Sequence, residues 1–351
     1  MRDVAIVSFA QAPNVRREVE RNEVELLMPV VQEAIQRSGI LREEIGFTCS
    51  GSSDYLTGQP FSFVIALDAV GAWPPIRESH VEMDGAWALY EAWVRLQHGD
   101  IDSALVYAFG KSSPGDIGDV LALQLDPYYL APLWPDPIGL AALQARALLD
   151  AGRCTEQDMA EVAARNRANA MDNPNAQVMG DFPVDELLAE PYLVSPLRKH
   201  DCPPVSDGAA AVVLVAGDLA NSVAERPAWI RGIDHRIEAH ALGARDLTTS
   251  ASTALAAEKA GLANGHLDLA ELHAPFTHQE LILRDALGLA DDVLVNPSGG
   301  ALAAHPIMVA GLIRIGEAAT RLMEGSAKRV VAHATSGPCL QQNLVCVMEA
   351  A

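Results

Sequence analysis

Short apolar runs alternate with segments of helical spacing in the first part of the chain. Asp3–Phe9 has the β-branched composition of a buried strand, and Glu23–Ser38 carries apolar residues on one helical face before a stop at Gly39. The same alternation predicts strands at Ile45–Ser50, Ser103–Phe109 and the densely apolar Gly208–Ala216, and a helix at Gly85–Gln97. Strands that alternate with helices in this way indicate an α/β fold with parallel strands.

A similar order returns after a linker at Ser222–Pro227. The predicted strands there are Trp229–Asp234, Leu267–Leu272, Ala327–Ala334 and Leu344–Met348, and the predicted helices are Thr248–Ala260, Gln279–Leu287 and His305–Arg321. Two stretches with the same order of elements indicate an internal duplication, visible as pattern and not as identity. We therefore expect an N-terminal half at residues 1–222 and a C-terminal half at residues 223–351.

An insertion interrupts the first half at about residues 112–200. Prolines cluster from Pro127 to Pro137, helices are predicted at Ile138–Ala151 and Thr155–Met171, and a mostly polar loop follows at Asp172–Asp181. An insertion of this kind between two core strands often contains residues that contact the substrate. We expect it to form a separate loop domain.

The composition is that of a compact, acidic protein. The 351 residues are 50% hydrophobic and the net charge is −21, a sign that opposes nucleic acid and anionic membrane surfaces. The five cysteines form no C-x-x-C pair, so we expect neither a bound metal nor a disulfide framework. The sequence shows no signal peptide and no apolar stretch long enough to span a membrane, which predicts a cytoplasmic protein.

Three histidines stand where predicted strands of the second half end or where a helix begins. His273 follows Leu267–Leu272, His305 follows a glycine-rich turn, and His333 lies near the end of Ala327–Ala334. Strand ends are the usual position of sites in such sheets. Three histidines at successive strand ends favour a catalytic role over a structural one.

The residues around these histidines resemble the thiolase superfamily. The stretch Asn296–Pro306 resembles the signature N-x-x-G-G followed by G-H-P, with Ala304 in place of the last glycine. Glu271–Phe276 resembles the E-L-H-D-C-F motif of sterol-carrier-protein thiolases, and Asp201–Ala211 matches the stretch that closes the first half of these enzymes. The ending Ser336–Asn343 looks like bacterial lipid-transfer relatives. The likeness covers most of the chain in the same order.

The resemblance implies a complete architecture. It implies two βαβαβαββ halves packed in a five-layer αβαβα thiolase fold, with the loop domain inserted in the first half. It also implies a homodimer or a thiolase-like heteromer. Lipid-transfer relatives are expected beside a second thiolase-like chain or a small OB-fold, zinc-ribbon acyl-CoA-associated protein.

The departures from the family pattern concern its cysteines. Aligning Gly85 and Ala88 with C-x-S-G-x-x-A places Glu82 at the nucleophile, and no cysteine lies between Cys49 and Cys154. Pro275 replaces the cysteine of H-D-C-F, and the late C-x-G cysteine maps near His333. Thiolysis requires a thiolate and a second acid or base, so ordinary thiolase activity is not expected.

The histidines that remain suggest a different reaction. His273 and His305 match the family histidines that hold the thioester oxygen as negative charge builds on it, and donors of this kind stabilise an enolate by roughly 3 kcal/mol each. Retro-aldol cleavage of a 3-hydroxyacyl-CoA uses such an enolate without a nucleophile. Lipid-transfer aldolases are expected to use tyrosines near the second and last motifs, where this chain has histidines.

Four catalytic candidates and four coenzyme A contacts follow. The catalytic candidates are His273, His305, His333 and Glu82, the last as a general base or as an N-cap that fills the space of the lost cysteine. The resemblance implies that coenzyme A, as part of the substrate and with no permanently bound cofactor, contacts Ser298, Gly299, Gly300 and Gly337. Cys339 is expected to be a buried structural thiol.

Three functions remain open. The first is a carbon–carbon lyase acting on acyl-CoA in lipid or sterol catabolism. The second is a catalytically silent subunit of a heteromeric acyl-CoA complex. The third is an acyltransferase or thiolase that uses some rewired residue.

Overall fold

Ten strands form one continuous sheet, and the strand order is the same in the two halves. The computed structural model describes residues 2–350. The first half contributes β1 (Val4–Gln11), β2 (Phe47–Gly51), β3 (Glu78–Val81), β4 (Ser103–Lys111) and β7 (Asp207–Ala216), and the second contributes β8 (Ala228–Ile237), β9 (Leu269–Leu272), β10 (Leu294–Val295), β11 (Arg329–Ser336) and β12 (Gln342–Glu349). Read from the outer edge of the sheet to its centre, the order is β3-β2-β4-β7-β1 in the first half and β10-β9-β11-β12-β8 in the second. Each half therefore repeats the other. The expected duplication is thus present as topology.

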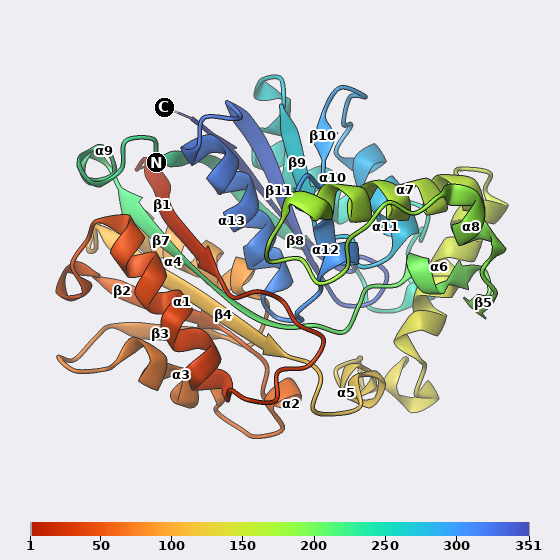
Figure 1. Ribbon diagram of the computed structural model, residues 1–351, viewed down its shortest axis with the longest axis horizontal. Coiled ribbons are helices and arrows are strands. Elements are labelled where there is room, and N and C mark those ends of the chain that lie inside the picture. The colour runs from red at the N-terminus through yellow and green to blue at the C-terminus, as the bar shows by residue number, and fades with distance from the viewer. Residues whose placement is uncertain (1, 351) are drawn as a thin grey trace.

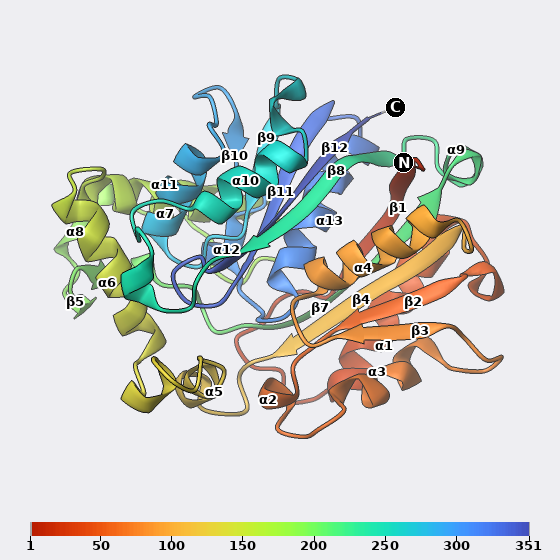
Figure 2. The same ribbon diagram turned by 180° about the vertical axis from the view of Figure 1, so that it is seen from behind.

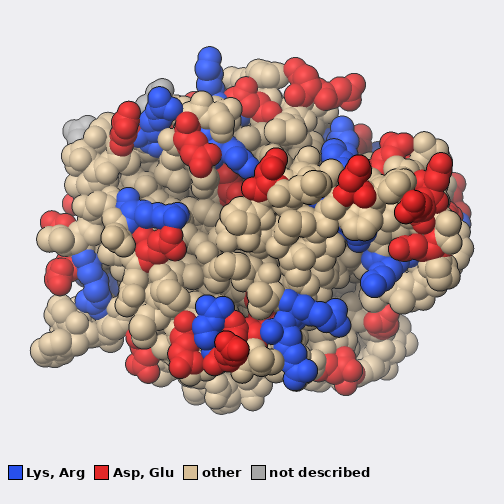
Figure 3. Space-filling view, viewed as in Figure 1, with Lys and Arg blue, Asp and Glu red and all other residues tan. Residues whose placement is uncertain are grey.

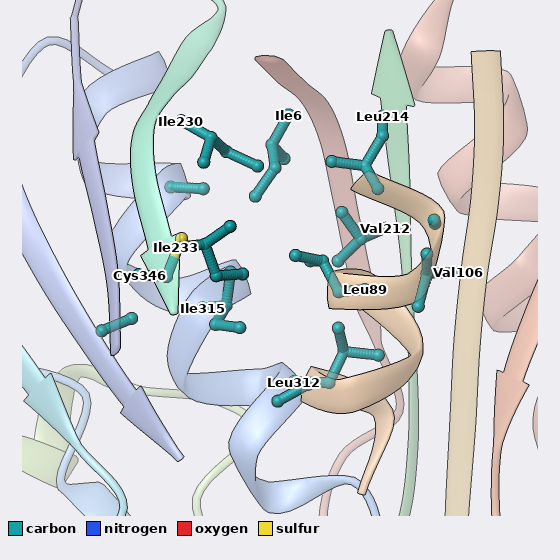
Figure 4. Packing of buried hydrophobic residues seen from close by; sticks show 14 of the residues in the cluster. Ile6, Leu89, Val106, Val212, Leu214, Ile230, Ile233, Leu312, Ile315 and Cys346 are labelled. Carbon is teal, nitrogen blue, oxygen red and sulfur yellow. The ribbon is translucent and has the colours of Figure 1, made fainter. Parts of the chain in front are cut away.

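The halves meet at β1 and β8, which pair over a short antiparallel stretch at Ala5–Trp229 and Ile6–Ala228. Beyond this contact the two half-sheets face each other, and two helices, α4 (Gly85–His98) and α13 (Ala310–Met323), lie between them (Figure 1). The largest apolar cluster fills this space. Figure 4 shows Leu89 of α4 and Leu312 and Ile315 of α13 between side chains of the two half-sheets.

The outer faces of the sheet are covered by one pair of helices each. In the first half these are α1 (Glu23–Ser38) and α3 (Ser62–Val70), and in the second α10 (Ala251–Lys259) and α11 (Thr277–Ala286) (Figure 2). Apolar residues beneath each pair form a separate cluster. The predicted five-layer αβαβα arrangement is therefore confirmed.

Corresponding glycines allow α4 and α13 to pack closely. A Cβ atom on Gly85 would lie 2.6 Å from the Cβ of Ala108, and one on Gly311 would lie 2.6 Å from the Cβ of Ala334. Contacts this short do not occur between real side chains, so both positions require glycine. The two helices consequently begin side by side at the same end of the sheet.

The insertion lies between β4 and β7. It contains α5 (Ile117–Leu123), α6 (Pro137–Asp150), α7 (Glu156–Asn169), α8 (Val184–Ala189), β5 (Tyr192–Val194) and β6 (Leu197–Arg198). It docks on the second half, where the buried Glu280 of α11 accepts hydrogen bonds from Arg165 and Asn166 of α7. The division of the chain at residue 222 stays a prediction.

Two sequence predictions need correction. The long helix expected at His305–Arg321 begins only at Ala310, because Pro306 forms a bridge to Ser206 and Met308 adopts a positive φ of 74°, which a right-handed helix does not contain. The linker expected at Ser222–Pro227 overlaps the end of α9 (Asp218–Val223). Short elements without clear periodicity were not predicted, among them α2 (Asp54–Thr57) and α12 (Gly300–Ala303). No helix of the described residues is long and apolar enough to cross a membrane.

Candidate active site

Two histidines that are far apart in the sequence meet at one end of the second half-sheet. The Nε2 atoms of His273 and His305 lie 3.0 Å apart. His273 follows β9, and its backbone N–H donates to the carbonyl of His333 on the neighbouring strand β11. The N–H of His305 donates to Oγ of Ser206 at 2.9 Å, which fixes the loop before α13. The sequence motifs on which both residues were predicted therefore converge in space.

The hydrogen bond between the rings has a definite direction. The backbone N–H of Thr335 donates to Nδ1 of His273 at 3.3 Å. A neutral His273 then carries its proton on Nε2, because a nitrogen that accepts a hydrogen bond has a free lone pair. Nε2 of His273 is consequently the donor and Nε2 of His305 the acceptor. A neutral His305 carries its proton on Nδ1.

Both rings are held neutral by burial and by a nearby cation. Burial, His305, His333 and Arg314 together lower the pKa of His273 well below its ordinary value. Burial and Arg314 lower the pKa of His305 to about 4. Arg314 is itself bound to the buried carboxylate of Glu271 at 2.8 Å. The pair therefore offers one N–H and one lone pair at neutral pH.

The pair lies on the wall of a cavity of about 490 Å³. The loop domain contributes residues of α5 and α6 to this wall, and the second half contributes Pro275, Phe276 and the segment Thr335–Leu340. Most of the lining side chains are apolar. A cavity of this size, with few polar groups, is typical of sites for small molecules or acyl chains.

Asp84 is a buried carboxylate that lines this cavity. Its Oδ1 accepts from the backbone N–H of Ala86 at 2.9 Å and of Leu312 at 3.0 Å, and its Oδ2 accepts from Gly311 at 2.9 Å. Burial raises the pKa of Asp84, while these three N–H groups and Arg314 act in the opposite direction. Asp84 therefore caps α4 and at the same time binds the start of α13. The sequence signal was an aspartate directly before the glycine that opens a helix.

Glu82 lies elsewhere. Its side chain is exposed and is absent from the residues that line the cavity. One carboxylate oxygen accepts from the backbone N–H of Asp54 at 2.7 Å, and the other lies 3.4 Å from Nε2 of His80. These contacts are those of a cap on the short helix α2. A catalytic role for Glu82 stays a prediction without support from this position.

His333 is fully buried but does not line the cavity. Its Nε2 lies 3.0 Å from Oδ1 of Asn343 on β12, and burial lowers its pKa to about 4. The residues of this strand that do line the cavity are Thr335 and Ser336, and Thr335 fits the first position of the C-x-G spacing. The catalytic role predicted for His333 stays a prediction. The residue lies on the strand next to β9, where its carbonyl accepts from the backbone N–H of His273.

Only one of the predicted coenzyme A contacts lines the cavity, namely Gly337. Ser298 is buried, and its Oγ donates to Glu271 and accepts from Arg314. Gly299, directly before α12, and Gly300, its first residue, adopt positive φ values of 97° and 64°. Contact of these three residues with coenzyme A stays a prediction.

Two thiols border the same cavity, and both are held in the protonated form. Burial raises the pKa of Cys202 to about 12 and that of Cys339 to about 11, although Arg245 acts against the second shift. Sγ of Cys339 also donates to the carbonyl of Leu140 at 3.4 Å. These are the properties of structural thiols, because the thiolate is the nucleophilic form. The interpretation of Cys339 as a buried thiol agrees with this position.

Comparison with known proteins identifies relatives of this chain, although no family model matches it. It is 31% identical over 221 residues to the acetyl-CoA acetyltransferase of Methanothermobacter thermautotrophicus, covering 56% of this chain and 58% of the relative. It is 24% identical over 311 residues to sterol carrier protein 2 of Homo sapiens, covering 74% of this chain and 54% of the relative. The chain thus spans little more than half the length of these two relatives.

A solved structure extends the likeness to the whole fold. The Ltp2-ChsH2(DUF35) aldolase superimposes with a TM-score of 0.81, covering 99% of this chain and 98% of that chain at 19% identity. At this level of identity the superposition speaks for the fold alone. The sequence relatives, together with the motifs that carry His273 and His305, support placing this chain in the thiolase superfamily, and the shared fold agrees with this.

Proposed function

We propose that this protein handles acyl-CoA and is a carbon–carbon lyase that cleaves a 3-hydroxyacyl-CoA by a retro-aldol reaction. The observation that carries the proposal is the directed pair of His273 and His305 on an apolar cavity whose thiols are protonated. One neutral ring supplies a proton donor and the other a lone pair. Retro-aldol cleavage requires these two functions and no covalent intermediate.

The two rings divide the work of the reaction. Nε2 of His305 takes the proton of the 3-hydroxyl group, the Cα–Cβ bond breaks, and C3 becomes a carbonyl carbon. The electron pair of that bond passes to Cα and the thioester carbonyl, where Nε2–H of His273 donates to the enolate oxygen. His305 then returns its proton to Cα and releases the shortened acyl-CoA. The proton is conserved, so the cycle requires no oxidant, reductant or added base.

His305 is a better base for this step than Asp84. The oxygens of Asp84 are taken up by three backbone N–H groups. The lone pair on Nε2 of His305 accepts only from His273 and becomes free when a substrate oxygen replaces it. Coenzyme A stays attached as the thioester throughout this scheme, first in the departing enolate and then in the shortened acyl-CoA.

The test is turnover of purified protein with 3-hydroxyacyl-CoA esters of steroid and branched-chain acids. We expect a carbonyl product and a shorter acyl-CoA, measured by liquid chromatography and mass spectrometry. His273→Ala and His305→Ala should each lower kcat about a hundredfold or more. His266→Ala, at an exposed position, is the control that keeps full activity. An acyl group found on Cys202 or Cys339 would instead support an acyltransferase.

A partner chain belongs to this proposal. The aldolase that shares the fold is named after two components, Ltp2 and ChsH2(DUF35). We therefore propose assembly with an acyl-CoA-associated partner, and the assay should be run with the chain alone and with co-purified proteins. If the complex keeps its activity after both histidine substitutions, this chain is a silent subunit and the lyase proposal fails.

A further inference from the structure

We infer that the cavity accepts a neutral, apolar acyl group and rejects acyl groups that carry a free carboxylate. This inference rests on the proposed handling of acyl-CoA and names the substrate class. It follows from the charged groups that border the cavity. Among its lining residues the charged side chains are Asp84, Asp116 and Asp136, and no lysine or arginine of the described part of the chain lines it.

Three helices begin at the cavity, and the start of each is already occupied by one of these carboxylates. Asp84 caps α4, Asp116 caps α5 and Asp136 caps α6. Asp116 accepts from the N–H groups of Gly118 and Asp119, and Asp136 accepts from that of Gly139 at 3.0 Å. An uncapped helix start attracts anions through its free N–H groups. Here those groups are taken, so they offer nothing to an anionic ligand.

Two arginines near the cavity wall, Arg245 and Arg314, are likewise engaged in hydrogen bonds within the protein. Arg245 lies behind the segment Thr335–Leu340 and donates to the carbonyls of Pro338 and Cys339 at 3.1 Å each. Arg314 is bound to Glu271 and Ser298. Neither of them lines the cavity. A carboxylate that entered would lose its water and find three other carboxylates and no cationic partner.

The negative charge of the surrounding surface also disfavours anionic ligands. The net charge is −21, and Figure 3 shows acidic side chains gathered over the loop domain around α7 and α8. The phosphates of coenzyme A must therefore bind outside the cavity, while the acyl chain occupies it. A neutral acyl chain loses only water on entering and gains the apolar wall.

The test compares two ligands that differ only in one charge. One is the coenzyme A thioester of a medium-chain dicarboxylic acid with its far carboxylate free, and the other is the same thioester as its methyl ester. Neither has a 3-hydroxyl group, so the proposed lyase reaction does not consume them. We expect the ester to bind at least about tenfold more tightly in calorimetry at low salt.

A charge-neutral variant assigns the effect to named residues. Asp116→Asn combined with Asp136→Asn keeps an N-cap at both helices but removes two charges from the cavity mouth. We expect the preference for the ester to fall at least about threefold. Asp172→Asn combined with Asp185→Asn removes the same charge from exposed positions outside the cavity and should leave the preference unchanged.

The outcomes separate this inference from the proposed function. Equal affinity of the wild-type protein for both ligands would overturn the inference and leave the lyase proposal standing. A preference that survives in the Asp116/Asp136 variant would overturn the role given to these residues. If neither thioester binds, the handling of acyl-CoA is wrong, and the inference falls with it.

Discussion

Oδ2 of Asp84 accepts a 2.9 Å hydrogen bond from the backbone N–H of Gly311, a residue 227 positions further along the chain. Asp84 opens the central helix of one half and Gly311 lies in the first turn of the central helix of the other. One buried carboxylate thus joins the two halves at the end of the molecule where the histidine pair lies.

Replacement of Asp84 should destabilise the protein more than replacement of an ordinary N-cap. Asp84→Ala leaves three backbone N–H groups without their acceptor in a buried place, and we expect a loss of about 2–4 kcal/mol in the free energy of unfolding. Asp116→Ala, at an exposed cap, should cost only about 1 kcal/mol. Urea unfolding measures both. Equal losses would show that the bond to the second half contributes little.

The histidine pair should remain neutral and keep its tautomers far below neutral pH. Because burial and Arg314 lower the pKa of His305 to about 4, the ring signals should stay those of neutral imidazole until about that pH. Nitrogen-15 NMR of labelled histidine should find the proton of His273 on Nε2 and that of His305 on Nδ1. The opposite assignment would contradict the directions given to donor and base.

Acid should destabilise the protein through its buried histidines. Burial lowers the pKa of His278 to about 3 and those of His305 and His333 to about 4, from an ordinary value of 6.5. Between these values the unfolded chain binds protons that the folded chain does not, so stability falls as the pH is lowered from 6.5. Each such histidine contributes a slope of about 1.4 kcal/mol per pH unit.

The share of His278 in this slope can be isolated. His278→Gln removes one titrating group and keeps a donor towards Oε1 of Gln144, which His278 approaches at 3.2 Å. Urea unfolding as a function of pH should then show a slope smaller by about one proton. His98→Gln, at an exposed position, serves as the control and should leave the slope unchanged. An unchanged slope in His278→Gln would mean that this ring is charged in the folded protein.

Glu280 should hold the loop domain on the second half. Its buried carboxylate accepts from Arg165, from Asn166 at 2.8 Å and from Asn296 at 2.9 Å. Glu280→Ala leaves Arg165 and two amide groups without their partner, and we expect a loss of about 3–5 kcal/mol. Limited proteolysis should then cut first between residues 137 and 201. Glu161→Ala on the exposed face of α7 should leave the cleavage pattern unchanged.

The sequence by itself determined the fold and the pair of histidines. Alternating strands and helices predicted an α/β fold with an internal duplication, because burial patterns and turn residues are local properties of the chain. The resemblance of the motifs around His273 and His305 to a known family implied the five layers and the site. The helices predicted at Glu23–Ser38 and Gly85–Gln97 agree closely with α1 and α4. The absence of a cysteine near Gly85 could also be read directly.

Only the tertiary structure decided which side chains face the cavity. Glu82 and Asp84 are two residues apart, yet the first caps α2 at the surface and the second joins α4 to α13. His333 and Thr335 are also two residues apart on one strand, and of these two only Thr335 lines the cavity. Its N–H donates to Nδ1 of His273 and so fixes the proton of that ring on Nε2. Such choices depend on partners between 28 and 227 residues away, and local periodicity carries no information about those partners.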